Sequence, residues 1–160
     1  AGGKLDPNRM FSRAGAEKSF RANNPSWSDD QVQRALDWLD AERPKLLDAL
    51  LPPPGGVLIA LHNNSNGYSV DTERPISQAE HLPRPGEPHE FFLATGRKDY
   101  DALARGPYNA VLQSNAAGED DGSLSRLCAA RGIRYVNLEV AHGKLETQKR
   151  MLQWFLTTLP

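Results

Sequence analysis

The feature that most constrains the fold is a series of short apolar runs, typical of β-strands, that alternate with stretches of helical character. The strand-like runs lie at 57–61, 91–95, 110–113 and 133–140. Strands that alternate with helices are typical of α/β proteins, in which crossover connections make neighbouring strands parallel. The sequence therefore predicts an α/β domain with a mainly parallel or mixed sheet and helices on both faces. Because the run 57–61 is apolar on both of its faces, we expect it to be a central strand.

The helical stretches have recognisable starts and stops. Ser28 and Gln31 have the spacing of a capping box, and apolar residues then recur at helical spacing as far as Leu50. We expect one long helix here that Pro44 kinks or splits. Shorter helices are expected at 100–105, at 124–131 with Asp121 as the cap, and over the apolar stripe 145–159. The polar segment 63–90 predicts a long surface loop that walls a pocket.

Composition narrows the class of protein. A length of 160 residues fits one domain over 1–160. With 19 Lys and Arg against 20 Asp and Glu, the net charge of -1 argues against nucleic acid and anionic membrane partners. The longest apolar run is too short to span a bilayer, and the compartment stays open. The single cysteine, Cys128, cannot form an intramolecular disulfide and is expected to be a small buried residue.

His62 directly follows the apolar run 57–61. Open α/β sheets place their ligand crevice at the carboxyl ends of their strands. An imidazole there can bind a metal through one ring nitrogen while an acceptor holds the other. It can equally serve only to hydrogen-bond the backbone of a loop, and its position alone leaves both interpretations open.

Glu139 ends a strand-like run and is the candidate catalytic residue. A carboxylate in this position costs free energy to desolvate unless it is paired. One interpretation is a salt bridge with Arg134 or Lys144. The other is a general base that accepts a proton from metal-bound water and passes it to a leaving amine. We assign Glu139 the second role.

Asn8 and Arg9 place a side-chain amide next to a guanidinium group, a combination suited to binding a carboxylate through two points. A surface arginine in a turn after Pro7 is the alternative. Tyr68 and Tyr108 lie between His62 and Glu139 in the sequence and are candidate substrate-binding residues. The acidic pair at 120–121 is explained by helix capping without a cation site.

The segment Asp6-Pro7-Asn8-Arg9-Met10-Phe11, His62 and Glu139 occur in the order and at the approximate spacing found in zinc metallocarboxypeptidases. From Leu5 to about Gly143 the chain resembles the later two-thirds of the catalytic domain of this superfamily, which includes succinylglutamate desuccinylases and aspartoacylase-like deacylases. The resemblance implies a carboxypeptidase-like fold that lacks its first elements. It also implies that His62 is a zinc ligand, that Glu139 is the general base, and that Asn8 and Arg9 bind the free carboxylate of the substrate.

The sequence departs from the family pattern in one respect, because it contains no His-x-x-Glu pair. A catalytic zinc needs about three protein ligands and an open position. Three explanations are open. The chain can be a fragment of a longer enzyme, with the first strands and the remaining ligands cut away or supplied by a separate N-terminal polypeptide that completes the domain, which is the explanation we favour. Alternatively the chain kept the fold and lost the metal, or His142, His81 or His89 assists His62.

The expected function is that of a zinc-dependent hydrolase that cleaves an amide bond next to a free carboxylate. Its substrate would be a peptide, as in a carboxypeptidase, or an N-acyl amino acid, as in a deacylase. One alternative is a non-catalytic carboxylate-binding or peptide-binding module on the same fold, with the metal site lost. A further alternative is an α/β domain in which Arg9, His62 and Glu139 never meet.

Overall fold

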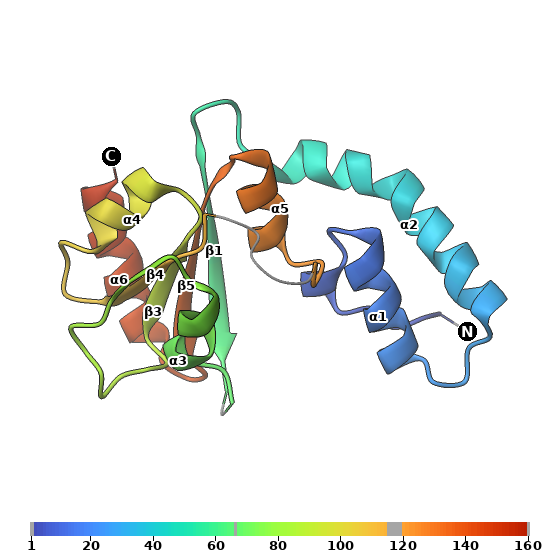
Figure 1. Cartoon of the computed structure of the whole chain (residues 1–160), viewed down its shortest axis with the longest axis horizontal. Helices are drawn as coiled ribbons and strands as arrows, with labels where there is room; N and C mark the ends of the chain where they lie inside the picture. The colour runs from blue at the N-terminus through green and yellow to red at the C-terminus, as the bar shows by residue number, and fades with distance from the viewer. Residues whose placement is uncertain (1, 66, 115–119, 160) are drawn as a thin grey trace. The chain divides into compact units, whose positions relative to one another are not determined.

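The computed structural model describes residues 2–65, 67–114 and 120–159, and these residues form two compact units. The first unit comprises the described residues of 1–53 and 119–127, and the second comprises those of 54–118 and 128–160. Figure 1 shows the helices and strands of both units. That the chain forms one domain over 1–160 stays a prediction. None of the helices in the described residues has the length and apolar character needed to span a bilayer.

The first unit is helical. It contains the 3-10 turn η1 (Pro7–Arg9), α1 (Arg13–Asn23) and α2 (Asp29–Leu50). The predicted capping box is confirmed, since the Ser28 side chain accepts from Gln31 N and the Gln31 side chain accepts from Ser28 N. The α2 helix is continuous through Pro44, so of the two predicted effects of this proline the split is wrong, and the kink stays a prediction. The core of the first unit consists of Ala16, Phe20, Val32, Leu36 and Leu39.

The backbone at the end of the turn η1 lies very close to the backbone of Gly122, which belongs to the same unit. The Phe11 backbone N–H donates to the Gly122 carbonyl oxygen at 3.0 Å. A Cβ atom on Gly122 would lie 2.4 Å from the Arg9 carbonyl oxygen, and Gly122 has a φ of +75°. Only glycine fits here, because both the positive φ and the lack of space exclude a side chain.

Gly122→Ala is therefore expected to lower the free energy of unfolding of the first unit by at least about 3 kcal/mol, from backbone strain plus overpacking. Gly132 is a matched control, because its φ is also positive at +64° but a Cβ there would meet no atom within 4 Å. Gly132→Ala should lose only about 1–2 kcal/mol. Amide hydrogen exchange under native conditions measures both losses, and equal losses would contradict the role of the close approach.

The second unit contains a five-stranded sheet in the order β1-β5-β3-β4-β2. The strands are β1 (Val57–Asn64), β2 (Ala79–His81), β3 (Phe91–Ala94), β4 (Asn109–Leu112) and β5 (Arg134–Ala141). The pairs β1–β5 and β3–β4 are parallel, whereas β3–β5 and β2–β4 are antiparallel. The predicted α/β class with a mixed sheet is confirmed, while the carboxypeptidase-like fold stays a prediction.

Two expectations about the chain around His62 are corrected. The β1 strand lies at an edge of the sheet in the described part of the chain, so the prediction of a central strand is wrong. It also continues through His62 to Asn64, because it pairs with β5 as far as Ala141. The segment 63–90 is not one long loop, since it contains α3 (Val70–Glu73), the 3-10 turn η2 (Arg74–Ile76) and β2.

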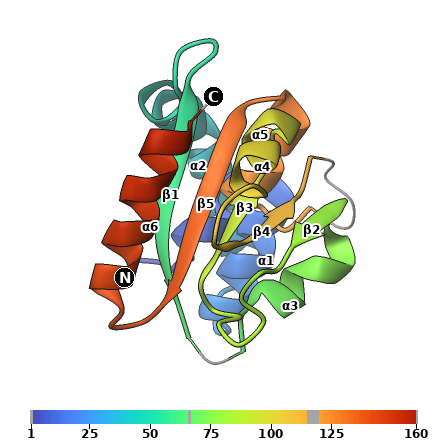
Figure 2. The same cartoon turned by 90° about the vertical axis from the view of Figure 1, so that its left-hand side faces the viewer.

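The helices α4 (Arg97–Leu103) and α6 (Leu145–Thr158) pack on one face of the sheet (Figure 2). The core on this face includes Val136, Leu138 and Val140 of β5. Because side chains alternate along a strand, Asn137 and Glu139 lie on the opposite face.

The helix α5 (Leu124–Arg131) is confirmed, but its N-terminus differs from the prediction. Ser123 rather than Asp121 accepts from its first turn, through the backbone N–H of Arg126 at 3.4 Å. Asp121 instead accepts from the Ser123 N–H at 2.9 Å. Cys128 is buried as predicted, and burial raises the pKa of its thiol to about 11.

Candidate functional site

His62 and Glu139 are register partners on the neighbouring parallel strands β1 and β5. The Nδ1 atom of His62 lies 3.3 Å from Oε1 of Glu139. The Glu139 side chain is 5% exposed and the His62 side chain 36%. Two of the residues selected from the sequence therefore form a pair in which a buried carboxylate meets a half-exposed imidazole.

Two asparagine amides complete the surroundings of the Glu139 carboxylate. Asn137 Nδ2 donates to Oε1 at 2.9 Å, and Asn64 Nδ2 donates to Oε2 at 3.2 Å. The salt bridges considered for Glu139 are not what the structure shows. Arg134 pairs with Asp99 and Lys144 with Glu90.

The contact with Glu139 selects one tautomer of His62. A carboxylate oxygen can only accept, so the Nδ1–H of His62 donates, which leaves a lone pair on Nε2. Gln148 Nε2 donates to the backbone carbonyl of His62 at 3.0 Å and ties β1 to α6. The half-exposed imidazole can therefore accept a proton, or bind a metal, through Nε2.

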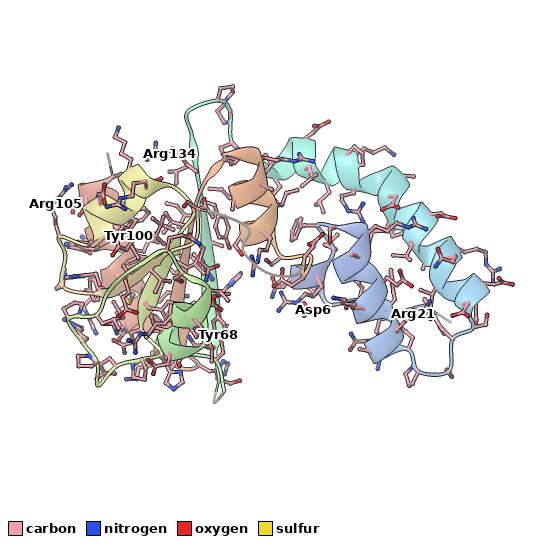
Figure 3. All side chains as sticks on the ribbon, viewed as in Figure 1. Asp6, Arg21, Tyr68, Tyr100, Arg105 and Arg134 are labelled. Carbon is pink, nitrogen blue, oxygen red and sulfur yellow. The ribbon has the colours of Figure 1, made fainter. Side chains whose placement is uncertain are left out.

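Tyr68 lies on the same face of the sheet as this pair. Its ring contacts Phe91, with the ring centroids 5.8 Å apart, and Phe91 is the register partner of Glu139 on β3. Figure 3 shows Tyr68 close to α3, whose last residue is Glu73. Burial raises the pKa of the Tyr68 phenol, and the charges of Glu73 and Glu139 raise it further. Tyr68 is therefore a neutral hydrogen-bond donor.

Tyr108 lies elsewhere in the second unit. Its ring packs on Phe92 and Trp154, in the cluster formed by α4, α6 and the sheet. The Arg84 guanidinium lies over the same ring, with Cζ 4.8 Å from the centroid. Because Phe92 and Glu139 are on opposite faces of the sheet, the structure does not bring Tyr108 to the His62–Glu139 pair.

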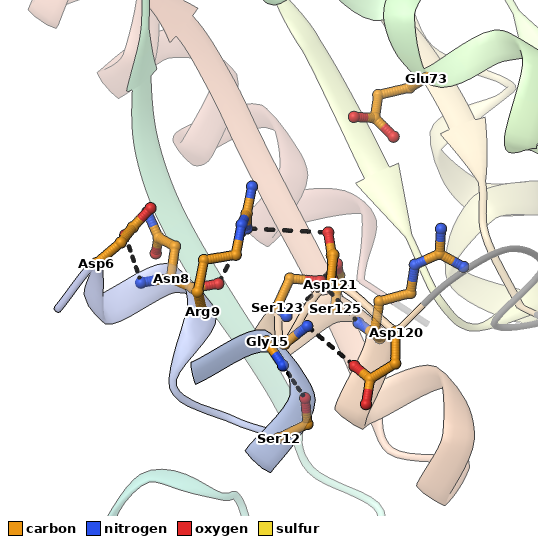
Figure 4. Close-up of polar contacts among 12 residues, drawn as sticks. Asp6, Asn8, Arg9, Ser12, Gly15, Glu73, Asp120, Asp121, Ser123 and Ser125 are labelled. Carbon is orange, nitrogen blue, oxygen red and sulfur yellow. Dashed lines mark hydrogen bonds and ion pairs between the residues drawn. The ribbon is translucent and has the colours of Figure 1, made fainter. Parts of the chain in front are cut away.

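Asn8 and Arg9 belong to the first unit, whereas His62 and Glu139 belong to the second. Arg9 Nη1 donates to the Asn8 carbonyl at 3.0 Å and lies 3.9 Å from Asp121 Oδ2 (Figure 4). Asn8 is exposed, and its backbone N–H donates to the Asp6 carboxylate at 2.8 Å. That Asn8 and Arg9 bind substrate stays a prediction.

The other histidines do not assemble around His62. His81 Nε2 contacts the Gly106 carbonyl at 3.1 Å, and His89 Nδ1 contacts the Tyr68 carbonyl at 2.8 Å. His142 is exposed. In the described residues, no group of three or more His, Cys, Asp or Glu side chains is arranged to hold a metal ion. A catalytic zinc needs about three protein ligands, so these residues alone do not fit one.

Sequence reasoning missed Asn64 and Asn137. Both carried a detectable signal, since Asn64 is two residues after His62 and Asn137 is two residues before Glu139. Residues two apart on a strand lie on the same face. The β-strand period therefore places both amides beside the predicted pair.

Comparison of the chain with protein-family models, curated proteins and solved structures gives no match. The resemblance to zinc metallocarboxypeptidases stays a prediction. The function has to be inferred from the site itself, in which a half-exposed imidazole, a buried carboxylate and a neutral phenol occupy one face of a sheet.

Proposed function

We propose that the chain is a hydrolase that cleaves an amide bond next to a free carboxylate, with His62 and Glu139 as its proton-transfer pair. The observation that carries the proposal is the 3.3 Å contact between His62 Nδ1 and Glu139 Oε1. It joins a buried charge to an imidazole that is open to solvent. This is the arrangement that general acid–base catalysis by histidine requires, since the carboxylate orients the ring and stabilises its charged form.

The reaction uses water as the nucleophile. The water oxygen attacks the amide carbon, and its proton passes to Nε2 of His62 while Glu139 holds the Nδ1–H. The pair then gives that proton to the leaving nitrogen as the C–N bond breaks, which yields a carboxylic acid and an amine. Tyr68, a neutral phenol on the same face, stays a candidate substrate-binding residue.

Zinc dependence belongs to the same proposal and is tested separately. The family resemblance would make His62 one zinc ligand through its Nε2 lone pair, and in that form of the mechanism Glu139 rather than His62 would receive the proton of the attacking water. The described residues supply too few ligands for this, so the remaining ones have to come from elsewhere, such as a separate N-terminal polypeptide. When bound, the metal would polarise the amide carbonyl and activate water.

A panel of N-acyl amino acids and short peptides tests the function. Each compound is paired with its carboxyl-amidated form, and the released amine is measured with added zinc and with chelator. We expect hydrolysis of the free carboxylates and at least about tenfold slower hydrolysis of the amidated forms, because a charge-assisted contact worth about 1.5–3 kcal/mol is lost. Failure to hydrolyse any of these compounds under either condition would contradict the proposal, and loss of activity in chelator would support the zinc requirement.

A non-catalytic carboxylate-binding module is the second candidate. It is favoured by the position of Arg9, whose half-exposed guanidinium lies in a different compact unit from the His62–Glu139 pair. This candidate predicts that an N-acyl amino acid binds equally well with and without chelator, and that Arg9→Ala weakens binding where Arg97→Ala does not. Calorimetry distinguishes the two candidates, because metal-dependent affinity or turnover of the ligand would exclude simple binding.

A further inference from the structure

The two asparagines beside Glu139 have an unusual hydrogen-bonding pattern. Asn64 is 6% exposed and Asn137 is 5% exposed. Each directs its Nδ2 group to the Glu139 carboxylate, yet the Oδ1 atom of each is buried without a hydrogen-bond partner within the described residues. Leaving a buried acceptor unpaired costs free energy, so the pattern needs a physical reason.

Asn109 shows what a structural asparagine looks like in the same sheet. It is 0% exposed and uses both ends of its amide. Its Nδ2 donates to the carbonyls of Arg84 and Glu87, and its Oδ1 accepts from the Arg84 N–H at 2.9 Å. An asparagine that only supports the fold is thus fully paired here, in contrast to Asn64 and Asn137.

The carboxylate explains the orientation of the two amides. If either amide were flipped, its Oδ1 would face an oxygen of Glu139 and the two acceptors would repel each other. Both asparagines therefore present N–H groups to Glu139 at the expense of their own carbonyl oxygens. The amide of Asn137 donates to this carboxylate, whereas Asn64 divides its Nδ2 group between Glu139 and the His89 carbonyl.

The two donors also fix the plane of the carboxylate. The last torsion of a glutamate side chain is broad and roughly two-fold, so the plane needs external restraint. Asn137 holds Oε1 and Asn64 holds Oε2. Asn64 is itself held, because its Nδ2 also donates to the His89 carbonyl at 2.9 Å. With both oxygens held, Oε1 stays directed at His62 Nδ1.

We propose that Asn64 and Asn137 are positioning residues that lock the Glu139 carboxylate toward His62. The inference rests on the proposed function, because fixing the Glu139 carboxylate serves catalysis only where Glu139 and His62 transfer protons. The asparagines touch no reacting atom in this scheme and act through Glu139. They keep His62 in the tautomer that carries the lone pair on Nε2.

Asn137→Leu tests this role, because leucine keeps the volume and removes the amide. We expect kcat to fall about 10-fold to 100-fold with KM unchanged, as is typical when a group that orients a catalytic side chain is lost. Asn109→Leu is the control, and per folded molecule, as measured by circular dichroism, its kcat should stay at the wild-type value. An unchanged kcat in Asn137→Leu, or an equal fall in Asn109→Leu, would overturn the proposal.

A spectroscopic measurement keeps the inference separate from the proposed function. Nitrogen-detected NMR of the His62 ring should show the Nδ1–H tautomer in the wild type and a shift toward the Nε2–H tautomer in Asn137→Leu. This result is expected whether or not a substrate has been found, so failure of the hydrolysis panel leaves it intact. An identical His62 tautomer in wild type and Asn137→Leu would overturn the positioning role.

Discussion

Replacing Glu139 with glutamine is expected to lower kcat about 100-fold to 10,000-fold on any substrate that the wild-type protein hydrolyses. The proton from the attacking water needs an ionised group to receive it, either directly or through His62. Glutamine has nearly the same shape and its side-chain oxygen can accept from His62 Nδ1, but it carries no charge and neither takes up the proton nor stabilises a charged imidazole. KM should change little, because Glu139 is buried and acts on the proton rather than on the bound substrate.

Glu90 provides the matched control for this experiment. It is buried like Glu139 and lies in the same unit, but its carboxylate pairs with Lys144 instead of a histidine. Glu90→Gln should keep its kcat within about fivefold of wild type, since a change below about 1 kcal/mol in the barrier has no larger effect. A wild-type kcat in Glu139→Gln would remove the proton-transfer role. A similar loss in both variants would point to general damage from altering a buried glutamate.

The strands and most helices could be predicted because they depend on local patterns. Apolar runs of strand-forming residues become strands wherever one face is buried, and the capping box at Ser28 fixes the start of α2. The α1 helix could not be predicted from the sequence, because its buried face consists of Gly15, Ala16, Ser19 and Phe20. Only one of these four side chains is large and apolar, so hydrophobic periodicity gives little signal there.

The neighbours of each strand could not be predicted from local patterns. The run 57–61 is as apolar as a central strand, yet β1 is at an edge. The antiparallel pairing of β3 with β5 depends on the path of the connections between them. The short β2 strand forms through its pairing with β4 rather than through its own residues. These features are set by tertiary contacts, which override local preference.

Part of the candidate site followed from the sequence, and part did not. The sequence shows that His62 and Glu139 lie at the ends of strand-like runs. Their contact cannot be predicted in the same way, because it depends on the register of β1 with β5. Arg134 could have been excluded as a partner of Glu139, because residues five apart on a strand face opposite sides of the sheet. The contact of Tyr68 with Phe91 depends on how the segment 63–90 folds, and local patterns predict only a loop there. It became visible only with the structure.

Arg134→Met is expected to give the largest loss of stability in the second unit, about 3–5 kcal/mol. Asp99 on α4 is 0% exposed, and Arg134 at the start of β5 donates to both of its oxygens, with Nε to Oδ2 at 3.0 Å. Arg134 Nη1 also donates to the Gly55 carbonyl at 3.2 Å, just before β1. Without the guanidinium the Asp99 carboxylate would be buried and unpaired, which is the most unfavourable state for such a group.

Two further variants separate this explanation from a simple loss of packing. Arg97→Met removes an exposed ion pair with Asp101 from the same helix, and it should change stability by less than about 1 kcal/mol. The double variant Asp99→Leu/Arg134→Met should recover most of the loss, because an apolar pair leaves no buried charge behind. Hydrogen exchange of the α4 and β5 amides measures the effect in the second unit alone. If the double variant were as unstable as Arg134→Met, the unpaired Asp99 carboxylate would not be the cause.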